Sequence, residues 1–150
     1  MGDLLAYHLT WTTYGSWLPG DGRGWVHAKQ SGTQHPNEHR QHFARVRLKT
    51  SPMRLDEADR RAVHVTIVSH CGFRRWTLHA LNVRTNHVHL VVSAAIDPDE
   101  AISQFKAWCS RSLNELHRSS RRWWTRGGST RYIFDQQYLE AAIRYVIEAQ

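Results

Sequence analysis

Residues 75–94 contain two segments in which apolar and polar residues alternate, joined by a tight turn. The first segment reads RWTLHALNVR and the second, which starts at His87, reads HVHLVVSA. Aliphatic and β-branched residues with a period of two are typical of strands. Thr85 and Asn86, which lie between the segments, form a turn signal. The sequence therefore predicts an antiparallel hairpin, and this hairpin restricts the chain to folds that contain an antiparallel sheet.

Further strands are expected on both sides of the hairpin. Residues 4–13, LLAYHLTWTT, are rich in aromatic and β-branched residues and predict a strand. A glycine-rich polar segment over residues 15–42 predicts a long loop, which is either functional or partly mobile. Short strands are expected at residues 43–48 and 130–135.

Three helices complete the pattern. The first starts near Leu55, although VHVTIV at 63–68 also alternates as a strand would. The second follows Asp97, a candidate N-cap, with Pro98 at the first helical position. The third covers residues 136–150. The expected inward faces are residues 55, 58, 62, 65 and 68–69 in the first helix, Ile102, Phe105, Trp108 or Cys109, Leu113 and Leu116 in the second, and Leu139, Ala142, Ile143 and Val146 in the third. The order predicts one α+β domain over residues 1–150.

The hairpin carries two histidines where aliphatic residues would be expected. Side chains alternate between the two faces of a strand, so His87 and His89 share one face with Val91, and Val88 and Leu90 share the other. Two neutral imidazoles at this spacing can bind one metal ion. The alternative is a pair of hydrogen-bonded surface histidines. The sequence does not continue as HxHxDH, which disfavours one class of metallo-hydrolases.

The charge of the chain indicates a polyanionic partner. The formal net charge is +7 without the eleven histidines, and nucleic acid is the usual partner of such a chain. The alternative is a basic surface that serves solubility.

The basic residues concentrate between residues 111 and 131, where two tryptophans interrupt them. Arginine binds phosphate as a fork, and indole offers a flat face to an unstacked base. This mixture predicts a single-strand binding surface; the alternative is a solvated loop whose tryptophans turn into the core. The candidate contacts are Arg111, Arg118, Arg121, Arg122, Trp123, Trp124 and Arg126.

Other classes of protein are disfavoured by composition. No apolar segment approaches the roughly 20 residues of a membrane helix, and no signal peptide is evident at the N-terminus. Cys71 and Cys109 lack CxxC spacing, which suggests two reduced thiols, with a single disulfide as the alternative.

Taken with its neighbours, TNHVHLVVS resembles the signature of the HUH single-tyrosine endonucleases. More narrowly, the chain is similar to bacterial insertion-sequence transposases and their REP-associated relatives. The resemblance rests on Asn86 before the histidine pair, a helix with Lys106 and Asn114, the tryptophans at 123–124 and the C-terminal segment IRYVIEAQ. It covers most of residues 55–150 and leaves the loop over 15–42 unexplained. It implies a ferredoxin/RRM-like antiparallel sheet with helices packed on it.

The resemblance also implies a function and a site. Tyr145 is expected to be the nucleophile that forms a 5′-phosphotyrosine intermediate with DNA, with Tyr138 as the rival. His87 and His89 are expected to hold Mg²⁺ or Mn²⁺. Relatives place a third ligand one turn after the tyrosine, where this chain has Ala149, so Glu148 and Gln150 are both candidates. Lys106 joins the DNA-binding residues.

The expected partners are single-stranded DNA, presented as hairpin ends, and a second copy of the chain. Location in the bacterial cytoplasm, associated with the nucleoid, goes with this activity. One alternative is a domesticated or non-catalytic relative that only binds hairpin DNA. A less favoured alternative is a two-histidine RNA phosphoesterase, because HLT at His8 and HVT at His64 are both HxT triplets.

Overall fold

The structure is a computed structural model that describes residues 2–16, 25–26, 33–34 and 52–148. The elements follow in the order β1 (Ala6–Thr12), β2 (Trp25–Val26), β3 (Thr33–Gln34), α2 (Glu57–Arg74), β4 (Thr77–Val83), β5 (His87–Ser93), α3 (Pro98–His117), β6 (Ser129–Ile133) and α4 (Gln136–Glu148). The predicted strand at 43–48 and most of the predicted loop over 15–42 lie outside the described residues.

The central element is a four-stranded sheet with the strand order β4-β5-β1-β6. Each neighbouring pair is antiparallel, so the predicted hairpin of β4 and β5 is confirmed. β5 and β1 are the two inner strands. β2 and β3 form a separate two-stranded ladder.

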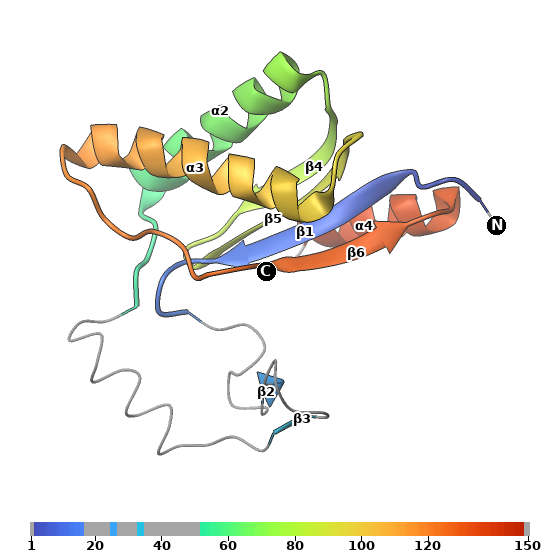
Figure 1. The fold of residues 1–150 in the computed structure, drawn as a ribbon, viewed down its shortest axis with the longest axis horizontal. Coiled ribbons are helices and arrows are strands. Elements are labelled where there is room, and N and C mark those ends of the chain that lie inside the picture. Colours follow the sequence, from blue (N-terminus) through green and yellow to red (C-terminus); the bar gives the residue numbers. More distant parts are fainter. Residues whose placement is uncertain (1, 17–24, 27–32, 35–51, 149–150) are drawn as a thin grey trace.

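Helices cover both faces of this sheet. α2 and α3 pack side by side on one face, and α4 lies on the other (Figure 1). The four long strands with α2 and α3 give the order β-α-β-β-α-β, which is the predicted ferredoxin-like α+β fold. α4 is the added element, and it covers the second face of the sheet.

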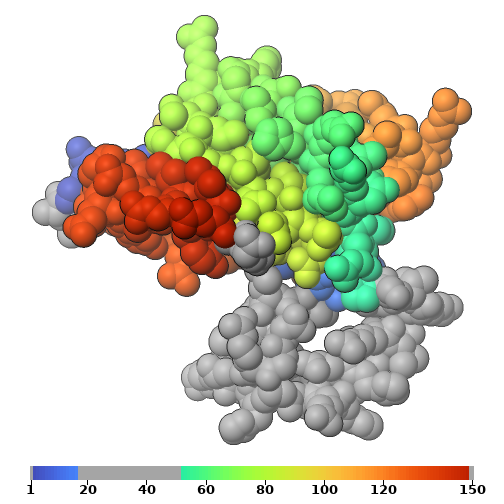
Figure 2. All heavy atoms as spheres, turned by 180° about the vertical axis from the view of Figure 1, so that it is seen from behind, coloured from blue at the N-terminus to red at the C-terminus, as the bar shows by residue number. Residues whose placement is uncertain are grey.

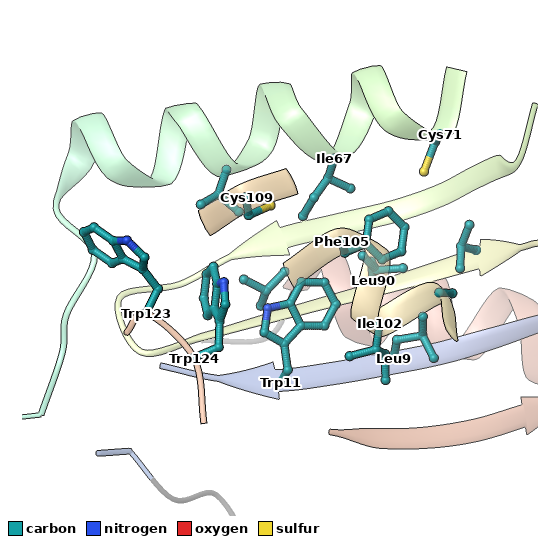
Figure 3. Packing of buried hydrophobic residues seen from close by; sticks show 14 of the residues in the cluster. Leu9, Trp11, Ile67, Cys71, Leu90, Ile102, Phe105, Cys109, Trp123 and Trp124 are labelled. Atoms are coloured by element: carbon teal, nitrogen blue, oxygen red, sulfur yellow. The ribbon is translucent and has the colours of Figure 1, made fainter. Parts of the chain in front are cut away.

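The larger core lies between the sheet and the pair α2 and α3. Val88, Leu90 and Val92 of β5 point into it, as their alternation predicts. Aromatic rings fill much of the remaining space, including Trp11 stacked on Phe105 with 5.8 Å between ring centroids (Figure 3).

Both α2 and α3 begin at a capping aspartate, and the cap of α3 was predicted from the sequence. Asp56 caps α2 and accepts a hydrogen bond from the Asp59 amide at 2.8 Å, and the Asp59 side chain accepts one from the Asp56 amide. Asp97 caps α3, with Pro98 in its first turn. These caps satisfy amides that have no partner inside the helix.

Two of the predicted inward faces are wrong in part. In α2, Val65 and Val68 are 56% and 47% exposed, whereas Val63, Ile67 and Cys71 are buried. In α3, Cys109 rather than Trp108 is buried, and Leu116 is 49% exposed.

Cys71 and Cys109 are both free thiols, and burial raises the pKa of Cys71 to about 11. Within the described part of the chain, no helix has the length and apolar character needed to cross a membrane.

Candidate active site

The sheet face opposite the larger core carries the histidine pair. His89 of β5 lies opposite Thr10 of β1, and Val91 lies opposite His8. Because side chains alternate, His8, His87 and His89 all project from the same face. This confirms the predicted division of β5 into an apolar side and a histidine side. The pair does not lie at the surface of the sheet edge: β5 is an inner strand, and His89 is only 2% exposed.

α4 packs across this face on a small apolar cluster. Leu139, Ala142 and Val146 are buried against Val91 and Ile133, and Ile143 lies at the edge of the cluster. These are the residues predicted to face inward. Figure 2 shows α4, in red, lying against the yellow-green residues of β4 and β5.

A cavity of about 650 Å³ opens between α4 and the strands. Its walls include His8, His87, His89, Tyr138 and Tyr145, together with Arg131 of β6. A larger depression of about 930 Å³ lies elsewhere, near Arg74, Trp76 and Tyr132. We place the candidate site in the smaller cavity because it combines imidazole, phenol and guanidinium groups.

Tyr145 lies directly over two of the histidine rings. Its ring centroid is 5.9 Å from that of His89 and 5.8 Å from that of His8, and both contacts are edge-to-face. The Tyr145 side chain is 61% exposed, so an incoming molecule can reach it. Tyr138 also lines the cavity, but among the described ring contacts only Tyr145 touches these histidines. The structure therefore brings the predicted nucleophile and the predicted histidine pair together in one chain.

The environment keeps the histidines neutral near pH 7. Burial is the main cause that lowers the pKa of His89 to about 4, and repulsion from His87 and His8 in their protonated forms and from Arg84 adds to it. Burial and the Arg84 charge lower the pKa of His87, and burial and the Arg131 charge lower that of His8. A neutral imidazole has a nitrogen lone pair, which is the form that binds metal.

The histidine pair fits a divalent ion in its chemistry. His87 Nδ1 donates to Asn86 Oδ1 at 2.9 Å, which leaves its Nε2 to act as a ligand. His89 Nε2 is buried without a hydrogen-bond partner. The ring centroids of His87 and His89 are 5.2 Å apart. In the described residues, no group of three His, Cys, Asp or Glu side chains already converges on one point.

Of the two candidates for a third ligand, the structure describes only Glu148. Glu148 is exposed at the end of α4 and does not line the cavity. Gln150 lies outside the described residues. His8, which the structure places beside His89, was considered from the sequence only as part of an HxT triplet and not as a neighbour of the histidine pair. Its signal was available: in the strand at 4–13, His8 alternates with Leu9 and Trp11, so it faces away from the apolar side.

The arginine-tryptophan segment divides into two parts. Trp123 and Trp124 are 1% and 6% exposed and belong to the larger core (Figure 3). Their predicted role as stacking faces for DNA bases is wrong, because both rings turn into the core, as the alternative interpretation proposed. Trp123 Nε1 donates to Asn114 Oδ1 at 2.8 Å, which stabilises the buried indole. The predicted arginines remain exposed: Arg111, Arg118, Arg121, Arg122 and Arg126.

Lys106 has a structural role that the sequence did not reveal. Its ammonium donates to the backbone oxygen of Thr125 at 2.8 Å and to that of Gly127. Burial and the neighbouring Arg122 charge lower its pKa. Lys106 therefore fixes the segment that leads into β6, where Arg131 lines the cavity.

The two HxT triplets do not share a site. His8 lies on the α4 face of the sheet, whereas His64 is exposed on α2, which packs on the opposite face. The two-histidine phosphoesterase interpretation is therefore wrong, because it requires both triplets to face one cleft.

Comparison with known proteins gives the family. Among solved structures, a Deinococcus radiodurans R1 protein assigned as a transposase is 15% identical, with a TM-score of 0.49 over 100% of this chain and 93% of that one. A REP-associated tyrosine transposase bound to a REP hairpin is 8% identical, with a TM-score of 0.50 over 97% of this chain and 66% of that one, a likeness that concerns the fold alone. No curated protein matches. A family model described as "Transposase IS200 like" matches residues 38–149. Because this match covers most of the sequence, the chain belongs to the IS200-like transposase family.

Proposed function

We propose that the protein cuts and rejoins single-stranded DNA with Tyr145 as the nucleophile. Family membership supports a DNA-processing enzyme. The observation that carries the finer proposal is the contact of Tyr145 with His89, 5.9 Å between ring centroids, at the mouth of a cavity. An exposed phenol beside neutral imidazoles and an arginine suits phosphoryl transfer.

In the cutting step, Tyr145 Oη attacks the phosphorus of a DNA phosphodiester. The bond from phosphorus to the 3′-oxygen breaks, the 3′-oxygen takes up a proton, and the 5′-phosphate remains on Tyr145. The phenol proton passes to solvent, which the exposed side chain of Tyr145 contacts. In the rejoining step, the 3′-hydroxyl of another strand attacks the phosphotyrosine and releases the phenol. The number of phosphate ester bonds stays constant, so no external energy source is needed.

The attack needs assistance because a free phenol has a pKa near 10. We propose that His87 and His89 hold Mg²⁺ or Mn²⁺, which when bound would stabilise the negative charge that develops on the scissile phosphate. His87 is oriented for this role by Asn86. Arg131, on the cavity wall, would add a fixed positive charge for the phosphate.

We further propose that the substrate is a single strand presented as a hairpin end. The exposed arginines between residues 111 and 126 provide positive charge for the backbone. The REP-associated neighbour is bound to a REP hairpin, and the same kind of DNA is the first substrate to test here. The homodimer predicted from the resemblance stays a prediction.

The test is a search for a covalent adduct. A library of single-stranded and hairpin oligonucleotides is labelled at the 3′ end, since the fragment attached to Tyr145 lies 3′ of the cut. The full chain and Mg²⁺ or Mn²⁺ are added, and denaturing gels reveal labelled protein. We expect an adduct that Tyr145→Phe abolishes while DNA binding remains.

Tyr138→Phe is the matched control, because Tyr138 lies on the same helix and lines the same cavity. It should keep the adduct. Loss of the adduct in Tyr138→Phe, with retention in Tyr145→Phe, would assign the nucleophile to Tyr138. Tight DNA binding without an adduct at any sequence would support the non-catalytic binding protein instead.

A further inference from the structure

Arg84 lies beside the histidine pair and has no part in the proposed function. Its backbone amide donates to the backbone oxygen of His87 at 2.8 Å, which closes the hairpin of β4 and β5. Two residues earlier in β4, Asn82 lies opposite His89. Because side chains alternate along a strand, Arg84 projects from the same face of the sheet as the two histidines. Residues opposite each other in an antiparallel pair have Cβ atoms about 5 Å apart, so Arg84 is an immediate neighbour of His87.

A second arginine lies at the turn of the same hairpin. Arg54 Nη2 is 3.5 Å from Thr85 Oγ1, and the amide of the next residue, Leu55, donates to the backbone oxygen of Thr85 at 2.7 Å. These contacts hold the segment before α2 against the turn, with the Arg54 side chain exposed beside it. Arg54 and Arg84 are named the turn arginines below.

No neighbouring acid balances the charge of the turn arginines. In the part of the chain that the structure describes, the ion pairs join other residues: Arg61 to Glu57, and His117 to Asp59. Arg84 is half-buried, and a cation that has lost part of its water gains from an anionic partner. The histidines beside it offer no negative charge. Burial is the main cause of their lowered pKa values, and the Arg84 charge adds to it.

We propose that the turn arginines bind backbone phosphates of the single strand that flank the phosphate being cut. The inference rests on the proposed function, which places the scissile phosphate at the histidine pair. A guanidinium group binds phosphate oxygens through two parallel hydrogen bonds. Arg84, next to His87, would bind the nearest flanking phosphate, and Arg54, on the other side of the turn residue Thr85, the following one. The strand therefore leaves the cavity over the hairpin turn.

Arg131 cannot hold the same phosphate as Arg84. Arg131 lies on β6 opposite His8, and β6 and β4 are the two outer strands of the sheet. Three strand intervals of about 4.8 Å separate them, or about 14 Å in all. The two arginines also differ in position along the strands, because His8 lies opposite Val91, four positions after His87, which adds about 13 Å. Arg131 and Arg84 thus lie on opposite sides of the histidine pair, and the DNA strand crosses the face between them.

The experiment removes the charge of one phosphate at a time. The probe is the oligonucleotide of the library that gives the strongest adduct or, if none does, the one that binds most tightly. It is prepared with a single neutral methylphosphonate at each position in turn. Binding to the full chain with Tyr145→Phe is measured by fluorescence anisotropy in EDTA, so that no metal ion contributes. We expect the affinity to fall roughly tenfold at one or two phosphates beside the cut, as for the loss of a hydrogen bond to a charged group.

Substitution of a turn arginine should remove this loss at one position only. Arg84→Gln should bind the unmodified oligonucleotide roughly tenfold more weakly, and a methylphosphonate at the nearest flanking phosphate should then have no further effect. Arg54→Gln should do the same at the following phosphate. Arg84→Lys keeps the charge without the fork, so it should retain part of the affinity and part of the loss at that position.

Arg74→Gln is the matched control. Arg74 is an exposed arginine in the last turn of α2, which leads into the opposite end of β4. The change in charge is the same, and every position of the scan should keep its effect. Circular dichroism confirms that each variant is folded.

The outcomes distinguish this inference from the proposed function. If Arg84→Gln keeps the full loss at every position, or differs from Arg74→Gln in no position, the role of the turn arginines is wrong, while the adduct formed by the unmodified chain still supports the proposed function. If both Arg84 variants fail to fold, a scan with no sensitive phosphate beside the cut overturns the inference without them. If no oligonucleotide gives an adduct but Arg84→Gln removes the loss at one phosphate, the proposed function fails and the binding of DNA by the turn arginines stands.

Discussion

The side-chain amide of Asn82 donates a 2.9 Å hydrogen bond to the backbone oxygen of Val146. Asn82 lies in β4 opposite His89 of β5, and Val146 follows Tyr145 in α4. This hydrogen bond therefore connects the turn of α4 that carries Tyr145 to β4, which pairs with the strand of the two histidines. It also pairs a carbonyl near the C-terminal end of α4, where helix carbonyls lack partners inside the helix.

Asn82→Ala removes this connection. We expect adduct formation to slow about tenfold, which corresponds to roughly 1.4 kcal/mol at the barrier, because Tyr145 is held less firmly over His89. The melting temperature should fall by about 2–4 °C, since a single hydrogen bond contributes about 1 kcal/mol to the stability of a chain of this size. Gln137→Ala, an exposed change on α4, is the control. An unchanged rate in Asn82→Ala would show that the bond does not position the tyrosine.

The contact between Tyr145 and His89 within one chain predicts how mixed variants behave. His87→Ala and Tyr145→Phe should each be inactive, and an equimolar mixture should remain inactive, because no chain then has both groups. Gel assays for the adduct give the result directly. Recovery of activity in the mixture would mean that α4 passes to a partner subunit in the active assembly.

Gly128 lies close to the strand beside the site. A Cβ atom at this position would be 2.9 Å from the backbone oxygen of Thr10 and 3.1 Å from Ile102. Gly128→Ala should therefore destabilise the protein by about 1–3 kcal/mol, as overpacking does. Gly72→Ala is the contrasting control, since it lies in α2 with nothing within 4 Å, and it should stabilise by about 0.5–1 kcal/mol. Urea denaturation measures both, and equal stability of the two variants would contradict the steric argument.

Lys106→Met keeps the aliphatic stem and removes the ammonium that bonds to the oxygens of Thr125 and Gly127. Two carbonyls then lose a charged donor, so we expect a loss of about 1–3 kcal/mol in the free energy of unfolding. Arg111→Met on the same helix is exposed and should change stability by less than about 0.5 kcal/mol. If Lys106→Met and Arg111→Met lost the same free energy of unfolding, Lys106 would stabilise the protein through its charge alone and not through its two hydrogen bonds.

The arginine-tryptophan segment predicts two separate effects. Trp123→Ala should cost about 3–5 kcal/mol of stability because it opens a cavity in the core. Arg121→Ala should leave stability nearly unchanged and weaken DNA binding, with the salt dependence reduced by about 0.7 for each lost phosphate contact. Chemical denaturation and binding isotherms at several salt concentrations separate the two. A Trp123→Ala variant that is fully stable but weak in DNA binding would reverse our assignment.

Local signals in the sequence predicted the elements well because those elements follow local rules. The alternation in residues 75–94 gave the hairpin, and Asp97 with Pro98 gave the start of α3. Which side of α2 faces inward depends on the elements that pack against it, so the sequence of the helix alone did not predict it. Val65 and Val68 are exposed because the sheet and α3 pack against the side that carries Val63 and Ile67.

The site was predictable only in part for the same reason. His87 and His89 are neighbours in the chain, and the resemblance supplied Tyr145. His8 is about eighty positions away in sequence, and only the pairing of β1 with β5 brings it to His89. The tryptophans were misassigned because a charged neighbourhood in sequence does not fix where a ring points. Both indoles pack in the larger core, where Trp123 donates to the Asn114 side chain and Trp124 donates to the backbone oxygen of Lys106.

Trp123 and Trp124 anchor the basic segment from the inside while its arginines stay in solvent. Within this short segment, the buried indoles stabilise the fold and the exposed arginines supply the positive surface. Exchange of Arg121, Arg122 and Arg126, the proposed contacts to the DNA backbone, should therefore change the affinity for DNA, while the two indoles, left in place, keep the core packed.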